Sequence, residues 1–539
     1  MAGLKASEDY GINEPSRRRS SAQPGKVKDE KHLDDVGEAV APPPAYEGFE
    51  AERRGSVNLS GEVDGTHRKL KPRHIQLIGI GGTIGTALYV QIGRGLLNGG
   101  PASLLIAFTL CPFIRFAGRY VDEAFGFAAG WNFFIFEAIL VPFEITACNV
   151  VIHYWSDVVP AGGIIAIVLV LYALINLLTV SWYGETEFWA ALGKVLLIIG
   201  LIILYWNNPG SFAPLYYEGN LGRFLGFLQC LIQASFTIAG PDYVSMAAGE
   251  AENPRVVMPK AYNAVFYRLT TFFILGALCV GINVPYNDPE LTAAFANGEP
   301  GAAASPYVVA MNRLRISVLP DIVNALVLAS AFSAGNSYVY CASRSLFGMA
   351  LEGKAPKIFT RTNRQGVPIY CVLAVLAISL LAFLQVSAGS ATVLSWFVSL
   401  ITASQLINFA VMCFTFLAWY KACNVQGLDR SKLPYRAFWQ PYAAWYGFVG
   451  CTIMAFVGGY TVFLPGQWSA SSFVFSYFMI GLCPVLFIGW KLIKKSKWRK
   501  PHELDLRGEV EEIDEYTRNF VQAPYRNFAD KWFNKAFGA

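Results

Sequence analysis

Two glycine-rich stretches interrupt apolar runs of this chain. The first is LIGIGGTIGTALYV, residues 77–90, inside a segment without charged side chains from His74 to Gly93. Each glycine costs an exposed helix interior about 1 kcal/mol relative to alanine, so this density predicts a required break. The second is FTIAGPDYVSMAAGE, residues 236–250, where Pro241 lacks an N–H and frees the carbonyl of Thr237.

Unwound backbone at two such breaks suits a small zwitterion. The N-terminus of a half-helix carries partial positive charge, so a carboxylate is expected on the residues from Thr83 to Thr86. Freed carbonyls between Phe236 and Gly240 would accept hydrogen bonds from an ammonium group. A molecule with both groups is an α-amino acid. Asp242 follows the second break and is interpreted either as a group that attracts cations or as a cap of the half-helix.

Simpler interpretations of both stretches remain open at this point. Gly81 and Gly85 form a GxxxG pattern, which packs membrane helices against one another. Gly240 and Pro241 also fit a simple helix kink. A dinucleotide-binding loop is excluded, because no strand precedes the glycines and no βαβ pattern follows them.

Three ionisable residues lie within apolar runs. Lys194 precedes a long uncharged stretch, and an ionisable group inside a membrane is a functional hypothesis by default. It is interpreted as a proton-exchanging group, or as a lysine that pairs with a carboxylate or reaches the membrane surface. Glu137 and Glu144 are seven residues apart, which places them on one helix face. They could relay protons or anchor the helix, and the sequence does not separate these roles.

The elements that would carry these residues are membrane-spanning helices. The chain has 539 residues, of which 54% are hydrophobic and 15% charged, compared with about 25% charged in soluble domains. Charged residues are concentrated at the two ends. We therefore predict a disordered cytosolic tail at 1–73, a transmembrane domain at 74–493 and a cytosolic tail at 494–539. The apolar runs do not alternate, so a transmembrane barrel is not expected.

Counting the spans points to a missing crossing. Eleven candidate helices begin near residues 75, 128, 163, 187, 224, 264, 321, 368, 391, 443 and 473. Basic clusters at 68–73, 344–364, 421–436 and 494–500 should all be cytosolic, which requires an even number of spans. The remaining candidate, residues 101–114, would reach only ~21 Å of the ~30 Å hydrocarbon core. We expect twelve nominal spans with span 2 shortened and both termini cytosolic.

This numbering places the two breaks in spans 1 and 6. Matched broken helices in the two halves are the best sequence pointer to a transporter site, and they indicate a five-plus-five inverted repeat. The ten cysteines form no CxxC pair, and the five histidines show no HxxxH spacing. We therefore predict no metal and no cofactor. Because a transporter performs no chemistry on its substrate, we also predict no enzymatic activity. The net charge is +5, and the basic residues lie at the expected membrane edges, where they set the orientation of the helices. This charge therefore does not indicate a nucleic-acid partner.

Three longer stretches resemble a known family. GGTIGTALYVQIGRGLLNGGPASLLIAF, AGPDYVSMAAGEAENPRVVMPKAY and SRSLFGMALEGKAPKIFTRTNRQGVP are similar to fungal amino acid permeases of the amino acid–polyamine–organocation (APC) superfamily. The resemblance covers roughly residues 68 to 530. It implies an all-α, LeuT-like core of two inverted five-helix repeats, location in the plasma membrane and proton symport of amino acids.

The resemblance also assigns roles to particular positions. It implies that the span 1 break binds the substrate carboxylate through Gly81, Gly82, Thr83, Ile84 and Gly85. It further implies that the span 6 break binds the amino group through Phe236, Ala239 and Gly240, and that Lys194 takes part in proton coupling.

The chain departs from this family in three ways that keep alternatives open, and one of them is a shortening at LLIIGLIILYWNNPGSF, where members usually run longer before YWNNPG. Pro241 and Asp242 stand where many members have Thr-Glu, which resembles the subgroup linked to polyamine and carnitine uptake or to its regulation. Two family segments join directly at Cys111, where members carry a full second span. The alternatives are a polyamine or carnitine permease, a non-transporting regulator on the same fold, and an inactive product lacking most of span 2.

Three lysines of the N-terminal tail, Lys26, Lys28 and Lys31, lie beside acidic residues. The resemblance implies that they accept ubiquitin from a ligase that controls endocytosis. The other interpretation is a solvated run of charges.

Overall fold

The computed structural model describes residues 120–156, 158–178, 215–237, 254–297, 305–313, 315–316, 318–363, 366–433 and 439–506, together with residues 88–89, 92, 94, 96–98, 190, 194, 197, 515 and 517–518. Contacts divide the chain into residues 1–52 and 53–539, and all described residues belong to the second unit. The predicted tail at 1–73 and the predicted short span at 101–114 lie outside the described residues.

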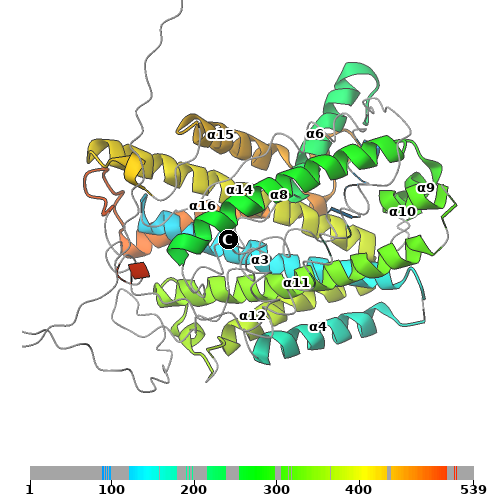
Figure 1. Ribbon diagram of the computed structural model, residues 1–539, viewed down its shortest axis with the longest axis horizontal. Coiled ribbons are helices and arrows are strands. Elements are labelled where there is room, and N and C mark those ends of the chain that lie inside the picture. The colour runs from blue at the N-terminus through cyan, green and yellow to red at the C-terminus, as the bar shows by residue number, and fades with distance from the viewer. Residues whose placement is uncertain are drawn as a thin grey trace, which may run out of the picture. The chain divides into compact units, whose positions relative to one another are not determined.

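The regular elements of the described residues are all helices (Figure 1). The longer ones are α3 (Glu123–Ile152), α4 (Ala161–Leu178), α6 (Gly219–Thr237), α8 (Pro254–Asn283), α11 (Leu319–Leu351), α14 (Ser390–Val425), α15 (Tyr442–Val457) and α16 (Ala470–Lys494). The shorter ones are α9 (Pro289–Asn297), α10 (Pro306–Arg313), α12 (Ile369–Ser379) and α13 (Gln385–Ala388), with the 3-10 helices η4 (Lys357–Thr360), η5 (Leu380–Leu384), η6 (Arg430–Lys432) and η7 (Tyr460–Phe463).

Within the described residues, five helical stretches are long and apolar enough to cross a membrane. They are Glu123–Ile152, Leu319–Leu351, Ile369–Ser387, Thr392–Val425 and Ala470–Lys494. Spans expected near 163, 321, 368, 391 and 443 correspond to helices that begin at 161, 319, 369, 390 and 442. The all-helical membrane fold is thereby confirmed, while twelve spans and the inverted repeat stay predictions.

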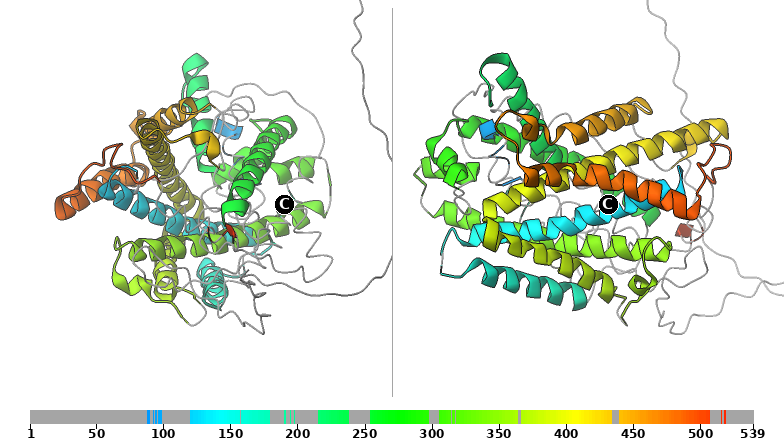
Figure 2. Two further views of the ribbon diagram at one scale, coloured as in Figure 1. Left: turned by 60° about the vertical axis from the view of Figure 1, so that its left-hand side comes forward. Right: turned by 180° about the vertical axis from the view of Figure 1, so that it is seen from behind.

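Helix α3 lies in the middle of the bundle. It contacts α4, α11 and α12 on one side and α14 and α16 on the other, an arrangement visible from two directions (Figure 2). Its sequence is apolar on all sides, and such a helix is expected to be buried within protein. The main apolar core accordingly gathers side chains from these helices around α3.

Glycines separate two pairs of consecutive helices. Gly389 has φ +79° and lies between α13 and α14. Gly466 also has φ +79° and lies between η7 and α16. Because a side chain makes a positive φ unfavourable, glycine permits the backbone to take this conformation between the helices. Ser469 then caps α16 by accepting a hydrogen bond from the Ser472 N–H at 3.4 Å.

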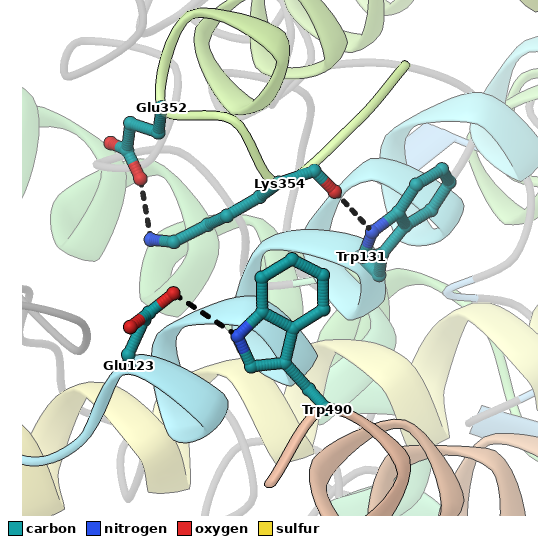
Figure 3. A network of polar contacts seen from close by, with 5 residues as sticks. All are labelled: Glu123, Trp131, Glu352, Lys354 and Trp490. Carbon is teal, nitrogen blue, oxygen red and sulfur yellow. Dashed lines mark hydrogen bonds and ion pairs between the residues drawn. The ribbon is translucent and has the colours of Figure 1, made fainter. Parts of the chain in front are cut away.

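Several helix ends meet at one end of the bundle (Figure 3). The Trp131 indole Nε1 donates to the carbonyl oxygen of Lys354, just beyond α11, at 3.2 Å. The Trp490 Nε1, near the end of α16, donates to the Glu123 carboxylate at 3.3 Å. The start of α3 and the ends of α11 and α16 therefore lie together. This geometry agrees with basic loops on one face of the membrane, and their cytosolic location stays a prediction.

Candidate substrate and proton-coupling site

The predicted site residues divide into those inside and those outside the described part of the chain. Phe236, Glu137, Glu144 and Lys194 are described, and all four are buried. The remainder of the two breaks lies outside the described residues, namely Gly81, Gly82, Thr83, Ile84, Gly85, Ala239, Gly240 and Asp242. The geometry can therefore be followed from the helices that lead to each break.

Phe236 lies in the last turn of α6, directly before the predicted second break. Its ring meets the ring of Phe143 edge-on, with centroids 5.3 Å apart and an interplanar angle of 77°. Edge-to-face contacts of this kind are a favoured arrangement of aromatic pairs. The contact holds the end of α6 against α3 at the residue next to Glu144.

Glu144 lies where α3, α4 and α11 meet. Its side chain is 1% exposed. A Cβ placed on Gly335 of α11 would lie 3.1 Å from the Glu144 Cβ and 2.1 Å from the Tyr172 Oη of α4. Because Tyr172 is itself fully buried, its hydroxyl has little room to move away. Only glycine therefore allows the three helices to approach this closely.

An amide pair continues this junction one residue along α11. The Asn176 Nδ2 of α4 donates to the Asn336 Oδ1 at 2.7 Å and to the Tyr172 carbonyl oxygen at 3.0 Å. We call Glu144, Tyr172, Asn176, Gly335 and Asn336 the polar junction. Since buried polar groups are costly without partners, these bonds fix the register of α4 against α11.

Lys194 is also buried, with 2% of its surface exposed. The Tyr89 hydroxyl donates to the carbonyl oxygen of Lys194 at 3.0 Å. The Ser305 hydroxyl in turn donates to the Tyr89 carbonyl oxygen at 2.8 Å. Tyr89 follows Gly85 by four residues, so the backbone at Lys194 lies against the chain that leaves the first predicted break.

Glu137 is fully buried on the same helix as Glu144. A second polar cluster lies more than one turn before it on α3. The Asn132 Nδ2 donates to the Ser404 carbonyl oxygen at 2.9 Å and to the Asn408 Oδ1 at 2.7 Å, while the Cys483 thiol donates to the Asn132 Oδ1 at 3.2 Å. This cluster joins α3 to α14 and α16.

Sequence reasoning missed the residues that surround the predicted ones. Tyr89 lies in the first glycine-rich stretch, but its residue type predicts no role there, and nothing in the sequence distinguishes Ser305. Asn176 is a polar residue in an apolar run, which is the kind of signal that could have identified it. Gly335 gives no such signal, because its close approach to Tyr172 depends on how α4 and α11 pack.

The described contacts place the buried Glu144 and the buried Lys194 beside the chain that leads to the two predicted breaks. Charged groups at such depth are expensive unless they pair or change protonation. Within the described residues, no group of three or more His, Cys, Asp and Glu side chains is placed to hold a metal ion.

Comparison with known proteins identifies the family. The family model described as Amino acid permease matches residues 110–503, which is more than half of the chain. General amino acid permease AGP2 of Saccharomyces cerevisiae is 45% identical, covering 87% of this chain and 86% of that protein. The proline-specific permease of Emericella nidulans is 38% identical, covering 91% of this chain and 98% of that protein.

One solved structure, the manganese transporter of Eremococcus coleocola, aligns with 78% of this chain and 93% of its own at 12% identity and a TM-score of 0.45. Assignment of the family rests on the sequence matches. Together with the apolar helices, these matches show that the chain is a multi-pass membrane protein that belongs to the amino acid permease family, among its fungal members.

Proposed function

We propose that the protein is a proton-coupled symporter of amino acids in the plasma membrane. The observation that carries this proposal is the position of Lys194 and Glu144. Each is buried, and each lies beside the chain next to one predicted break, through Tyr89 in one case and through Phe143 and Phe236 in the other.

The substrate is proposed to lie between the two breaks. Backbone N–H groups of Gly81, Gly82, Thr83, Ile84 and Gly85 would take its carboxylate. The backbone at Phe236, Ala239 and Gly240 would take its amino group, and Asp242 would add attraction for the cation. Both ends of an amino acid are then satisfied by backbone groups, which leaves its side chain to face other helices.

Protons are proposed to exchange at Lys194 and Glu144, with Glu137 as the next carboxyl group along α3. When the Lys194 ammonium gives one N–H proton to water or to a carboxylate it becomes a neutral amine, so the local charge falls by one while every bond of the substrate stays intact. Alternating access would rock one group of helices against the other around the fixed site. The substrate leaves chemically unchanged, consistent with a transporter rather than an enzyme.

Replacement of Lys194 tests the coupling. In vesicles containing the purified full chain under an imposed pH gradient, we expect Lys194→Ala to abolish proton-driven accumulation of amino acids. Exchange of labelled for unlabelled substrate should be partly retained, because the breaks themselves are intact. Radiolabelled uptake and exchange are the measurements.

Lys421→Ala is the matched control, since Lys421 is exposed on α14. It should transport like the unaltered protein. Unchanged proton-driven accumulation in Lys194→Ala would overturn the coupling role. Loss of both accumulation and exchange would place Lys194 in substrate binding instead.

A polyamine or carnitine permease is the second candidate. The observation that favours it is Pro241-Asp242 after the glycine of the second break, because the Asp242 carboxylate suits an additional cationic group. Competition separates the two: amino acids should displace labelled substrate if the first proposal holds, whereas spermidine or carnitine should do so if the second holds. Binding of either without uptake would favour a non-transporting regulator or an inactive product.

The tails complete the proposal. Both are proposed to be cytosolic, with Lys26, Lys28 and Lys31 as acceptors for a ubiquitin ligase. Replacing all three by arginine keeps the charge and should slow removal of the protein from the cell surface.

A further inference from the structure

The chain beyond α16 folds back onto the ends of other helices. We call residues Ser496–Leu504 the C-terminal strap. Its Arg499 N–H donates to the Val121 carbonyl oxygen, directly before α3, at 3.1 Å. The Gln426 Nε2 at the end of α14 donates to the carbonyl oxygens of Pro501 and Leu504 at 2.9 and 2.7 Å. The strap is thus held by two separate helices.

The Asp122 carboxylate makes the contacts at the start of the C-terminal strap. Asp122 has a fully buried side chain and caps α3 by accepting from the Ala124 N–H at 2.9 Å. The Lys491 ammonium of α16 forms an ion pair with it. The Ser496 hydroxyl donates to the Asp122 Oδ1 at 2.7 Å. Asp122 therefore joins α3, α16 and the strap through a single group.

Positive charge surrounds Ser496 in the sequence. Lys494 and Lys495 precede it, and Lys497 and Arg499 follow it, all with exposed side chains. Enzymes that modify serine select their substrates partly by complementary charge patterns. A serine with basic residues on both sides is therefore a suitable target for a protein kinase that has an acidic substrate groove.

We propose that Ser496 is a phosphorylation site and that its modification releases the C-terminal strap from Asp122. A kinase would transfer the γ-phosphoryl group of ATP to the Ser496 Oγ. The O–H bond breaks, its proton passes to the kinase base, the new P–O bond forms, and ADP leaves. The proposed cytosolic location of this tail is the location in which ATP is present.

The physical reason for release is the loss of a donor and the gain of like charge. The unmodified hydroxyl donates to Asp122, whereas the ester oxygen of phosphoserine has no proton to donate, and the phosphate group carries a charge of about −1.5 to −2 at pH 7. It would face a buried carboxylate. The exposed cations at Lys494, Lys495 and Lys497 would attract the phosphate toward solvent, and thus away from α3.

Release and modification reinforce each other. Ser496 is partly buried while it is bonded to Asp122, so a kinase reaches it when the strap is undocked. Phosphorylation then lowers the stability of the docked state only. The modified chain consequently accumulates in the released state, which is a shift of population between two arrangements.

Hydrogen exchange at the Arg499 amide reports docking, since this N–H is bonded to Val121. The full-length purified chain is treated with ATP and a basophilic serine kinase, at an amount that fully modifies a peptide of residues 490–502. Mass spectrometry then locates phosphate and measures exchange across the strap. We expect phosphate on Ser496 and exchange about tenfold faster at Arg499.

Ser496→Glu should also make hydrogen exchange at the Arg499 amide faster. Ser496→Ala should have a smaller effect, because it removes one hydrogen bond without adding a negative charge. Ser431→Glu is the matched control. Ser431 also lies between basic residues and donates to a carboxylate, that of Asp429 at 2.7 Å, but this contact stays within its own turn. Absence of phosphate on Ser496, or unchanged Arg499 exchange once it is modified, would overturn the proposal.

Discussion

Helices α3 and α16 are nearly equal in hydropathy and opposite in burial. Their most apolar windows have mean hydropathies of 1.8 and 2.0, yet 83% of the α3 window and 11% of the α16 window are buried within the protein. The outward side chains of α16 include Val474, Phe478, Val485 and Ile488. Apolar composition therefore places a helix in the membrane without saying whether lipid or protein surrounds it.

Polar residues distinguish the two helices. Helix α3 buries Asn132, Glu137, Glu144 and Asn149, whereas the buried residues of α16 are Ser476 and Met479. Buried polar groups need partners, and only a helix surrounded by protein finds them. A polar residue in a long apolar run is thus a better sign of a central, functional helix than the hydropathy of the run.

The largest expected effect comes from crowding the polar junction. Gly335→Ala places a Cβ 2.1 Å from the Tyr172 Oη and 2.8 Å from its Cζ. Because neighbouring groups must shift, we expect a loss of stability of about 3 kcal/mol and little correctly folded protein. Thermal unfolding in detergent measures it.

Gly481→Ala on α16 is the control that tests the comparison, because nothing lies within 4 Å of a Cβ there. It should not lower the midpoint temperature and should raise it slightly, because alanine is favoured over glycine in a helix interior by up to about 1 kcal/mol. Equal effects of the two substitutions would show that α3, α4 and α11 are not packed more tightly than α16.

A smaller effect is expected from neutralising one buried carboxyl group of α3. Glu144→Gln keeps the size of the side chain, so folding should be preserved. If the helix carries the coupling proton, the accumulation ratio under a pH gradient should fall to about one, the limit for an uncoupled carrier. Uptake into vesicles measures this ratio.

Glu123→Gln, at the exposed first turn of the same helix, should accumulate substrate normally. If Glu144→Gln still concentrates substrate, Glu144 does not carry the coupling proton, and its role is in the packing of α3.

The smallest expected effect is a pH dependence of the docking of the C-terminal strap at Asp122, the residue that joins α3 and α16. Burial by itself raises the pKa of Asp122, but hydrogen bonds from Lys491, Ser496 and Ala124 outweigh it and lower the pKa below its ordinary value. A lowered pKa in the folded state stabilises docking above about pH 3.9. This stabilisation is lost as the pH falls through the lowered value.

Fluorescence of Trp498, together with Arg499 exchange, should stay constant from pH 7 to about pH 3.9 and then change as the pH is lowered further through the lowered pKa of Asp122. In Asp122→Asn the acid-dependent step should disappear, and the strap should be loosened at every pH. A transition of unchanged size in that variant would assign it to another carboxyl group.

Much of the fold could be predicted because the membrane imposes simple limits. A span needs about 20 apolar residues, and charges gather at its ends. The expected starts near 163, 321, 368, 391 and 443 therefore agree closely with the observed helices. The interruptions before α14 and α16 were also predictable, since polar and glycine-rich residues cannot continue an apolar span.

The candidate site could be predicted only in part. Lys194, Glu137 and Glu144 were recognisable because an ionisable group in an apolar run is rare. Their surroundings were not, because the partners of Glu144 come from helices far away in the chain. Tyr172 and Gly335 carry no unusual sequence pattern, and only the packing of α4 against α11 brings them to Glu144.

By itself, the sequence determined that this is a multi-pass helical membrane protein, where several of its helices begin and to which family it belongs, since these depend on local composition and on motifs. The starts expected near 128, 224 and 264 lie five to ten residues after the observed ones at 123, 219 and 254. Tertiary structure alone decided that α3 is central while α16 lies outside, and that the strap returns to Asp122. The reason is physical: apolar helices are equally soluble in lipid, so their arrangement is set by shape and by a few buried polar contacts between residues distant in the chain.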